Sequence, residues 1–257
     1  MIPKIIHYCW LSGDPIPKKL TECMQSWKLH LPDYEFKLWD KNQFDINTVE
    51  WVREAFDNKK YAFAADYIRL YALYTEGGIY LDMDVEIVKS FNNLLNREYI
   101  LGYEKEKGIE AGIMGATAEA AWLKKCLNYY KDRHFVNPDG SFNTRPLPRI
   151  IYSVLKDDLK SMEIFSNEVL TAKSYYTGEY NITDKTYTIH HFAGSWLSPV
   201  EELSYNIRNR IPLLPEKAKG HIAKILAIGK IKGIRQAIKD ERRWITHNLS
   251  SIFNTKK

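Results

Sequence analysis

Apolar residues recur at helical spacing through residues 62–76, where neither proline nor glycine interrupts the chain. This spacing predicts an amphipathic helix of about four turns. Gly77 and Gly78 follow directly, and glycine readily adopts the positive φ that commonly ends a helix. Through residues 79–87 apolar and polar residues then alternate, which is the period of a half-buried strand. The pattern therefore predicts a helix, a glycine stop and a strand in direct succession.

The rest of the chain predicts further strands and helices in alternation. Apolar segments predict strands at residues 2–10, 34–39 and 99–104 and around Tyr187, and helical spacing predicts helices at 18–29, within 43–60 and at 120–130. Residues 134–148 are rich in Asn, Pro, Asp and Gly, which predicts a long irregular loop of the kind that forms lids or acceptor sites. Strands that alternate with helices indicate an α/β fold, with a mostly parallel mixed sheet flanked by helices.

Charge is unevenly distributed along the 257 residues. Residues 207–257 carry 13 Lys and Arg against 3 Asp and Glu, whereas residues 1–206 carry 24 against 29. At this length and 45% hydrophobic composition, one α/β domain with a helical appendage is the natural expectation. We therefore expect a domain at 1–206 and a basic amphipathic helical tail at 207–257.

The spacing of apolar residues in the tail predicts two short basic helices rather than one, because the apolar stripe drifts past Gly229 and Gly233. Such helices commonly lie on an anionic membrane surface, and the alternative is a helical cap whose lysines are solvated. The basic stretch has few aromatic residues and no recognised binding motif, which argues against nucleic acid.

Three cysteines, widely spaced and odd in number, predict neither a disulfide framework nor a zinc site. This favours a reducing, cytoplasmic environment. We expect no signal peptide and no transmembrane helix. Together with the tail, these features predict a peripheral protein at the inner face of the cell membrane.

Paired carboxylates are the clearest chemical feature. Residues two apart on a strand share a face about 6 to 7 Å apart, so Tyr80, Asp82 and Asp84 are expected to point the same way. Two such carboxylates repel unless a cation lies between them, and Mg²⁺ or Mn²⁺ is the usual one. On the preceding helix, Asp66 and Arg69 share one face. The alternative is a solvated acidic edge and a surface ion pair.

This combination resembles the signature of the D-x-D sugar transferases, glycosyltransferase family 32. The matching residues are Ala62, Asp66, Arg69, Gly77, Gly78, Tyr80, Asp82 and Asp84. That family includes initiating mannosyltransferases and capsular polysaccharide enzymes, and its core is similar to that of the large clostridial glucosylating toxins. The resemblance implies a GT-A fold, a nucleotide-sugar donor and Mn²⁺ or Mg²⁺.

The resemblance also implies a catalytic set of four residues. Asp66 and Arg69 would hold the donor sugar, Asp82 would touch ribose or metal, and Asp84 would ligate the metal. Tyr80 would pack near the nucleotide. One position departs from the pattern, because Ala65 stands where relatives often have Ser, and this weakens any inference about the sugar.

The first strand leads into a loop containing Gly13, a common place for a nucleotide in an α/β domain. By the resemblance, Trp10 would stack on the nucleobase there. The alternative is that Trp10 is a core residue.

A second informative stretch is residues 187–196, which contain adjacent histidines on a predicted strand. Adjacent residues face opposite ways, so only one of the two can point into the site. The resemblance assigns His191 as the third metal ligand, with His190 or neither as alternatives, and a histidine ligand would favour manganese. By the same resemblance Ser195 and Trp196 would reach the donor's phosphates.

The glycine-rich residues 108–116 contain Glu110 as their one acid. The resemblance places this stretch beside the reacting sugar, and the alternative is an ordinary solvated loop acid.

Together these expectations describe a retaining, metal-dependent hexosyltransferase. It would move a hexose from UDP-galactose or UDP-glucose to a glycan or lipid-linked oligosaccharide in surface or capsular polysaccharide assembly. One alternative is a transferase that modifies protein, as the toxins do. Another is a non-catalytic, membrane-associated carbohydrate-binding protein with a decayed site, against which the intact acidic residues argue.

Overall fold

The computed structural model describes most of the chain. The described residues are 1–105, 108–175, 177–193, 200, 203–204, 207 and 216–232. The chain divides into two compact units, one of Met1–Tyr175 and Glu179–Ala193, and one of Tyr176–Gly178 and Gly194–Lys257. The division near Ala193 lies ahead of the boundary that the charge distribution predicts at residue 206.

A five-stranded sheet forms the centre of the first unit, in the order β2-β1-β3-β8-β5. Its strands are β1 (Ile5–Cys9), β2 (Glu35–Trp39), β3 (Gly78–Leu81), β5 (Tyr99–Ile100) and β8 (Ile113–Ala116). Strands β2, β1 and β3 pair in parallel, and β8 is antiparallel to both β3 and β5. Four strands therefore run in one direction and β8 in the other, which confirms the predicted mostly parallel mixed sheet.

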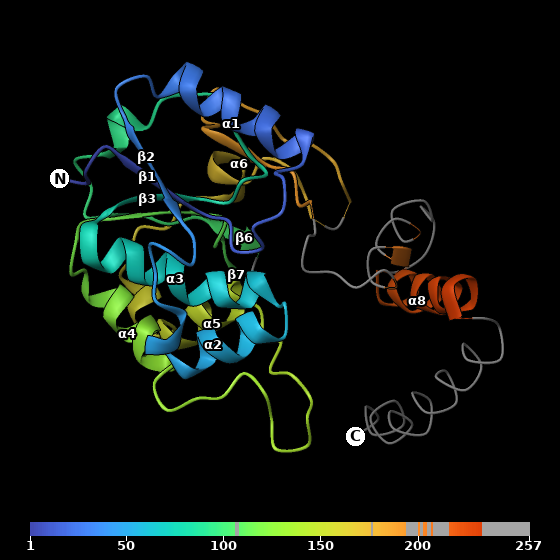
Figure 1. Ribbon diagram of the computed structural model, residues 1–257. Helices are drawn as coiled ribbons and strands as arrows, with labels where there is room; N and C mark the ends of the chain where they lie inside the picture. The colour runs from blue at the N-terminus through green and yellow to red at the C-terminus, as the bar shows by residue number, and fades with distance from the viewer. Residues whose placement is uncertain are drawn as a thin grey trace, which may run out of the picture. The chain divides into compact units, whose positions relative to one another are not determined.

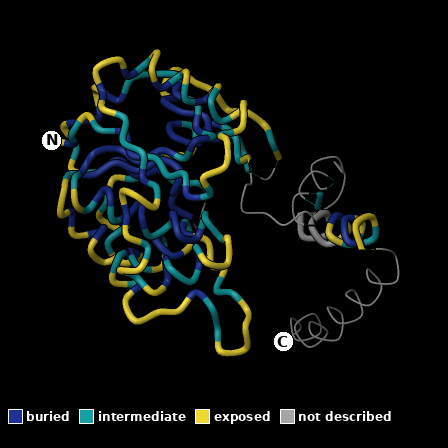
Figure 2. Tube along the Cα trace, viewed as in Figure 1, coloured by how far each residue is buried: buried dark blue, intermediate teal, exposed yellow. Residues whose placement is uncertain are grey.

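Helices cover both faces of this sheet (Figure 1). On one face lie α1 (Lys18–His30) and α6 (Asn167–Leu170), and on the other lie α2 (Glu50–Asp57), α3 (Tyr61–Glu76), α4 (Ala121–Tyr129) and α5 (Leu147–Val154). Short 3₁₀ helices lie at η1 (Ile46–Thr48), η2 (Phe91–Leu94) and η3 (Asp158–Lys160). Each face has its own apolar core, and Figure 2 shows the buried residues following the strands. The helices predicted at 18–29, 62–76 and 120–130 are confirmed.

The glycine pair after α3 sets the start of β3. Gly77 and Gly78 have φ of 67° and 100°. A Cβ on Gly78 would lie 2.7 Å from the Ile5 carbonyl oxygen and 3.0 Å from His7 Nε2. Both glycines are therefore required, for backbone conformation and for the close approach of β3 to β1.

The strand predicted at residues 79–87 is wrong in its length. It ends at Leu81, a turn follows, and β4 (Val85–Ile87) pairs antiparallel with β9 (Thr188–His190) in a separate two-stranded sheet. The turn is closed by the Val85 amide, which donates to the Asp82 carbonyl at 3.0 Å. Polar and apolar residues keep alternating through the turn, so the sequence period does not reveal it.

The strand predicted at residues 99–104 is also divided. Gly102 separates β5 from β6 (Tyr103–Lys105), which pairs with β7 (Gly108–Ile109). A Cβ on Gly102 would lie 3.0 Å from the Leu170 side chain, so glycine is the residue that lets α6 pack closely here.

In the second unit, α8 (Glu216–Lys232) is one helix that continues through Gly229. Gly229 therefore does not end the helix, because a single glycine costs a helix only about 1 kcal/mol. Gly233, the other position at which the stripe is predicted to drift, lies outside the described residues. Ile222 and Leu226 are exposed, whereas Ala223, Ala227 and Ile228 are buried. The second predicted tail helix lies outside the described residues. Of the helices that are described, none has the length and apolar character needed to span a membrane.

Candidate active site

The site begins on α3, where Asp66 and Arg69 form the predicted pair. Arg69 Nη2 lies 3.3 Å from Asp66 Oδ1, and Arg69 Nη1 lies 3.2 Å from Asp82 Oδ1. Nη1 also donates to the Ala111 carbonyl at 2.8 Å. The Arg69 side chain is only 7% exposed. Its buried positive charge is balanced by contacts with groups from three segments of the chain.

Tyr80 contributes to the same cluster from β3. The Arg69 guanidinium lies 4.6 Å from the centre of the Tyr80 ring, and the Tyr80 hydroxyl donates to Asp82 Oδ1 at 2.9 Å. Tyr80 and Asp82 therefore share one face, as the sequence predicts.

Asp84 lies in a turn between β3 and β4, and not on a continuous strand as predicted. The turn after Asp82, rather than a continuing strand, carries Asp84 next to β9. There the Ala193 amide donates to Asp84 Oδ2 at 2.6 Å, and the His191 amide donates to the Asp84 carbonyl at 3.0 Å.

The histidine beside the two aspartates is His190, so the placement predicted for His191 is corrected. His190 Nε2 lies 3.4 Å from Asp84 Oδ1, and its side chain is 10% exposed. His191 Nε2 lies instead 2.8 Å from Glu86 Oε2. His190 is the last residue of β9, and its pairing with Val85 of β4 turns its side chain inward, whereas His191 follows the strand and faces the other way.

Asp82, Asp84 and His190 fit a divalent cation. One ligand atom from each lies within 4.8 Å of the others. Two carboxylate oxygens and an imidazole nitrogen are a donor set that Mn²⁺ accepts readily and Mg²⁺ less so. These are the residues that could hold the metal predicted from the sequence.

Glu110 is buried at the back of this cluster, at 2% exposure. Its Oε1 lies 3.1 Å from His190 Nδ1 and accepts from the Gly112 amide at 2.6 Å. Its Oε2 accepts from the Thr171 hydroxyl at 2.7 Å. Glu110 is therefore not a solvated loop acid, and nothing local in the sequence marks its link to Thr171.

Burial and neighbouring groups shift the pKa values of Asp66 and Asp84 in opposite directions. Burial raises the pKa of Asp66 to about 7, with Arg69 opposing and Asp82 adding to the rise. Burial also opposes ionisation of Asp84, but His190 and the Ala193 amide outweigh it and lower its pKa to about 2. The pKa values of these two carboxyl groups are thus shifted to opposite sides of the ordinary value for aspartate.

Trp10 and Gly13 lie where β1 ends. The Trp10 amide donates to the Trp39 carbonyl at 3.1 Å, and its indole Nε1 donates to the Asp14 carbonyl at 2.7 Å. Trp10 is half-buried, and Gly13 has φ 74° with open space around it. Ser195 and Trp196 lie outside the described residues.

A comparison with protein families identifies the segment that carries this cluster. Residues 17–101 match the family described as "Glycosyltransferase sugar-binding region containing DXD motif". This segment is thus similar to the sugar-binding region of DXD glycosyltransferases. The match confirms the resemblance described above over these residues, and the observed mixed sheet agrees with the α/β fold class that was predicted.

Curated relatives of this DXD glycosyltransferase segment include two yeast proteins. Inositol phosphoceramide mannosyltransferase 3 of Schizosaccharomyces pombe is 35% identical over 155 residues, 57% of this chain and 43% of that protein. Mannosyl phosphorylinositol ceramide synthase SUR1 of Saccharomyces cerevisiae is 31% identical over 144 residues, 54% of this chain and 37% of that protein. The chain thus matches less than half the length of these relatives.

Solved structures with some likeness are also glycosyltransferases. PaToxG glycosyltransferase is 20% identical, covers 63% of this chain and 71% of its own, and has a TM-score of 0.48. The galactosyltransferase LgtC, in complex with donor and acceptor sugar analogues, is 13% identical, covers 85% and 95%, and has a TM-score of 0.41.

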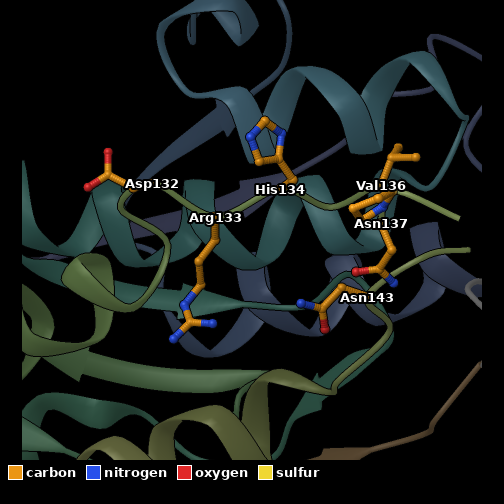
Figure 3. Close-up of a pocket in the computed structure, with 7 residues that line it drawn as sticks. Asp132, Arg133, His134, Val136, Asn137 and Asn143 are labelled. Atoms are coloured by element: carbon orange, nitrogen blue, oxygen red, sulfur yellow. The ribbon is translucent and has the colours of Figure 1, made fainter. Parts of the chain in front are cut away.

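The DXD segment also contacts the long loop between α4 and α5. This loop borders a pocket of about 500 Å³, lined by Asp132, Arg133, His134, Val136, Asn137, Pro138 and Asn143 (Figure 3). Glu54 on α2 anchors the loop, since it accepts from the amides of Phe135 and Val136 at 2.7 and 2.9 Å. The irregular segment predicted at 134–148 is confirmed, except that α5 begins at Leu147.

Proposed function

We propose that this protein is a metal-dependent glycosyltransferase that transfers a hexose from a nucleotide diphosphate donor. One observation carries the proposal. The ligand atoms of Asp82, Asp84 and His190 lie within 4.8 Å of one another, directly beside the buried Asp66–Arg69 pair. A cation position next to a fixed cationic side chain suits a donor with a sugar at one end and a diphosphate at the other.

Arg69 is held in one orientation by its contacts. Its guanidinium contacts Asp66, Asp82 and the Ala111 carbonyl, so it is oriented before any donor binds. A cationic side chain that is already oriented in this way stabilises negative charge as it develops in the reaction, without any reorganisation of the site. In the proposal it faces the oxygen atoms of the donor, and the Asp66 carboxyl group accepts from a sugar hydroxyl.

Asp82, Asp84 and His190 would hold Mn²⁺ or Mg²⁺. When bound, the cation supplies charge that neutralises the leaving diphosphate. Trp10 and the loop containing Gly13 would receive the nucleobase, where the half-buried indole offers a face for stacking. Ser195 and Trp196 remain predicted contacts of the phosphates.

The finer assignment of donor and acceptor rests on the family resemblance described in the sequence analysis. We propose UDP-galactose or UDP-glucose as donor, with retention of configuration and a glycan or lipid-linked oligosaccharide of surface polysaccharide assembly as acceptor. The two yeast relatives are named as an inositol phosphoceramide mannosyltransferase and a mannosyl phosphorylinositol ceramide synthase, which makes a mannose donor and a lipid acceptor the second candidate.

We also propose that residues 207–257 hold the protein on the inner, anionic face of the cell membrane. The excess of basic residues in this tail and the exposed Ile222 and Leu226 of α8 support this proposal. A membrane location would suit a lipid-linked acceptor.

The test is donor hydrolysis by the purified protein. UDP-galactose, UDP-glucose and GDP-mannose are each incubated with and without Mn²⁺, and with the Asp84→Asn variant as control. We expect slow hydrolysis of one donor that requires the metal and is lost in the variant. If the wild-type protein binds a sugar but hydrolyses none of these donors with metal present, the non-catalytic carbohydrate-binding alternative replaces this proposal.

A further inference from the structure

We propose that Glu110 is a positioning residue that orients the imidazole of His190 as the third metal ligand. This inference rests on the proposed metal site and adds to it the group that determines which nitrogen faces the cation. Glu110 lies in the loop before β8, and His190 is the last residue of β9. One segment therefore supplies the proposed ligand, and a segment far away in the chain orients it.

The contacts of Glu110 leave it little freedom. Its carboxylate is buried and accepts hydrogen bonds from the Gly112 amide at 2.6 Å and the Thr171 hydroxyl at 2.7 Å. Its Oε1 then lies 3.1 Å from His190 Nδ1. The carboxylate is thus held from two other directions while it contacts the imidazole.

An ionised carboxylate only accepts hydrogen bonds, so His190 Nδ1 must carry the hydrogen and donate to Glu110. Nε2 is then the nitrogen that faces Asp84 Oδ1, at 3.4 Å. Histidines that bind metal commonly donate their other ring nitrogen to a carboxylate, which fixes both tautomer and ring orientation. The Glu110–His190 pair has this arrangement.

Gly112 lies between the Glu110–His190 pair and Asp82. A Cβ at Gly112 would lie 2.6 Å from His190 Cε1 and 3.0 Å from Asp82 Oδ2, so glycine is needed for these two side chains to approach. The Gly112 carbonyl also accepts from the Asp82 amide at 2.7 Å. The same short loop therefore holds Glu110 and Asp82 in a fixed relation.

The neighbouring histidine provides a matched control. Glu86 Oε2 lies 2.8 Å from His191 Nε2, which is a second carboxylate–imidazole pair one residue further along. This pair is 41% and 32% exposed, and neither residue belongs to the group of Asp82, Asp84 and His190. Glu86→Gln thus removes the same kind of carboxylate charge from beside a histidine while leaving the proposed ligands unchanged.

The experiment measures Mn²⁺ binding to the full chain by titration calorimetry and electron paramagnetic resonance. We expect Glu110→Gln to weaken Mn²⁺ affinity by about 10- to 100-fold, the usual effect of mutating the carboxylate partner of a metal-binding histidine. Glu86→Gln should leave the affinity within about twofold of wild type, as expected for an exposed pair. Spin-echo modulation from a directly bonded imidazole nitrogen should be present in wild type and Glu86→Gln, absent in His190→Ala and diminished in Glu110→Gln.

The outcomes separate this inference from the function on which it rests. If wild-type protein binds no Mn²⁺, the proposed metal site fails and this inference fails with it. If wild type binds and Glu110→Gln binds equally well with unchanged nitrogen modulation, the inference alone is wrong. It is also wrong if Glu86→Gln gives the larger loss, which would assign the ligand to His191. Should Glu110→Gln not fold, Thr171→Val removes one contact of the carboxylate, and unchanged Mn²⁺ affinity in that variant overturns the inference.

Discussion

Arg69 Nη1 lies 3.2 Å from Asp82 Oδ1, and this ion pair joins α3 to the turn that follows β3. The same nitrogen also donates to the Ala111 carbonyl, which belongs to the segment leading into β8. Removing one member of a buried ion pair leaves the other charge without a partner, at a cost of several kcal/mol. Arg69 and Asp82 are therefore best left intact in tests of the site, and the groups around them are changed instead.

Asp84→Asn should abolish donor hydrolysis and the increase in melting temperature produced by Mn²⁺ with nucleotide diphosphate. It should also lower the stability of the metal-free protein by about 2 kcal/mol near neutral pH, since the lowered pKa of Asp84, about 2, reflects stabilisation of its carboxylate. This corrects the simple expectation that relief of a repulsive pair would stabilise the fold, because His190 already lies beside Asp84.

The difference in stability between metal-free wild type and Asp84→Asn should depend on pH with a definite sign. A depressed folded-state pKa gives stability that is present above about pH 4 and is lost as the pH falls toward 2. The stability gap between wild type and Asp84→Asn should close over this range in urea denaturation. A metal-dependent shift of wild-type size in the variant would contradict the assignment of Asp84.

Asp66→Asn should affect stability in the opposite direction. Burial raises the pKa of Asp66 to about 7, so the folded state holds its proton more tightly than the unfolded chain, and stability is lost as the pH rises from about 4 to 7. The variant has no such proton to lose. Its stability relative to metal-free wild type should increase across this range, by at most about 4 kcal/mol. Parallel pH profiles for the two proteins would contradict the raised pKa.

The same variant separates sugar binding from metal binding. Asp66 does not belong to the group of residues that could hold the cation. Asp66→Asn should therefore keep wild-type affinity for nucleotide diphosphate with Mn²⁺ and lose affinity for the intact donor. Calorimetry with both ligands measures the difference, and an equal loss for both would argue against contact with the sugar.

Gly78→Ala should destabilise the protein by about 2 to 5 kcal/mol, which combines the cost of positive φ with overpacking. The new Cβ would lie 2.7 Å from the Ile5 carbonyl oxygen, a backbone atom of the central sheet. Gly140→Ala is the matched control, because Gly140 also has positive φ but has open space around it. It should cost only about 1 to 2 kcal/mol. Equal losses in urea denaturation would show that the contact with β1 adds nothing.

Trp10→Ala should weaken binding of free nucleotide by about 1 to 3 kcal/mol if the indole stacks on the base. Trp10→Phe should retain most of the affinity, because it keeps an aromatic face for stacking and loses only the hydrogen bond to the Asp14 carbonyl. Calorimetry of folded variants decides the matter, and unchanged affinity in Trp10→Ala would make Trp10 a core residue.

Removal of residues 207–257 should abolish binding to anionic vesicles. Each basic residue near the surface contributes about 1 kcal/mol, so binding by the full chain should fall steeply with salt. Co-sedimentation with anionic and neutral vesicles tests this expectation. Equal sedimentation with both kinds, or no effect of the deletion, would favour a helical cap.

Local features of the sequence predicted the parts of the site that lie close together in the chain. Helical spacing places Asp66 and Arg69 on one face of α3, and strand alternation places Tyr80 beside Asp82, because both patterns follow from backbone geometry over a few residues. The alternation of strands and helices likewise predicted the mixed sheet, since parallel strands require crossover connections.

The tertiary structure decided which histidine joins the aspartates and what holds it. The ring of His190 contacts Glu110, 80 residues earlier in the chain, and β9 turns that ring inward only through its pairing with β4. A one-residue change in this register would present His191 instead. Strand register and contacts between distant segments depend on how the whole core packs, so the period of a single segment could predict a histidine in the site without deciding which one.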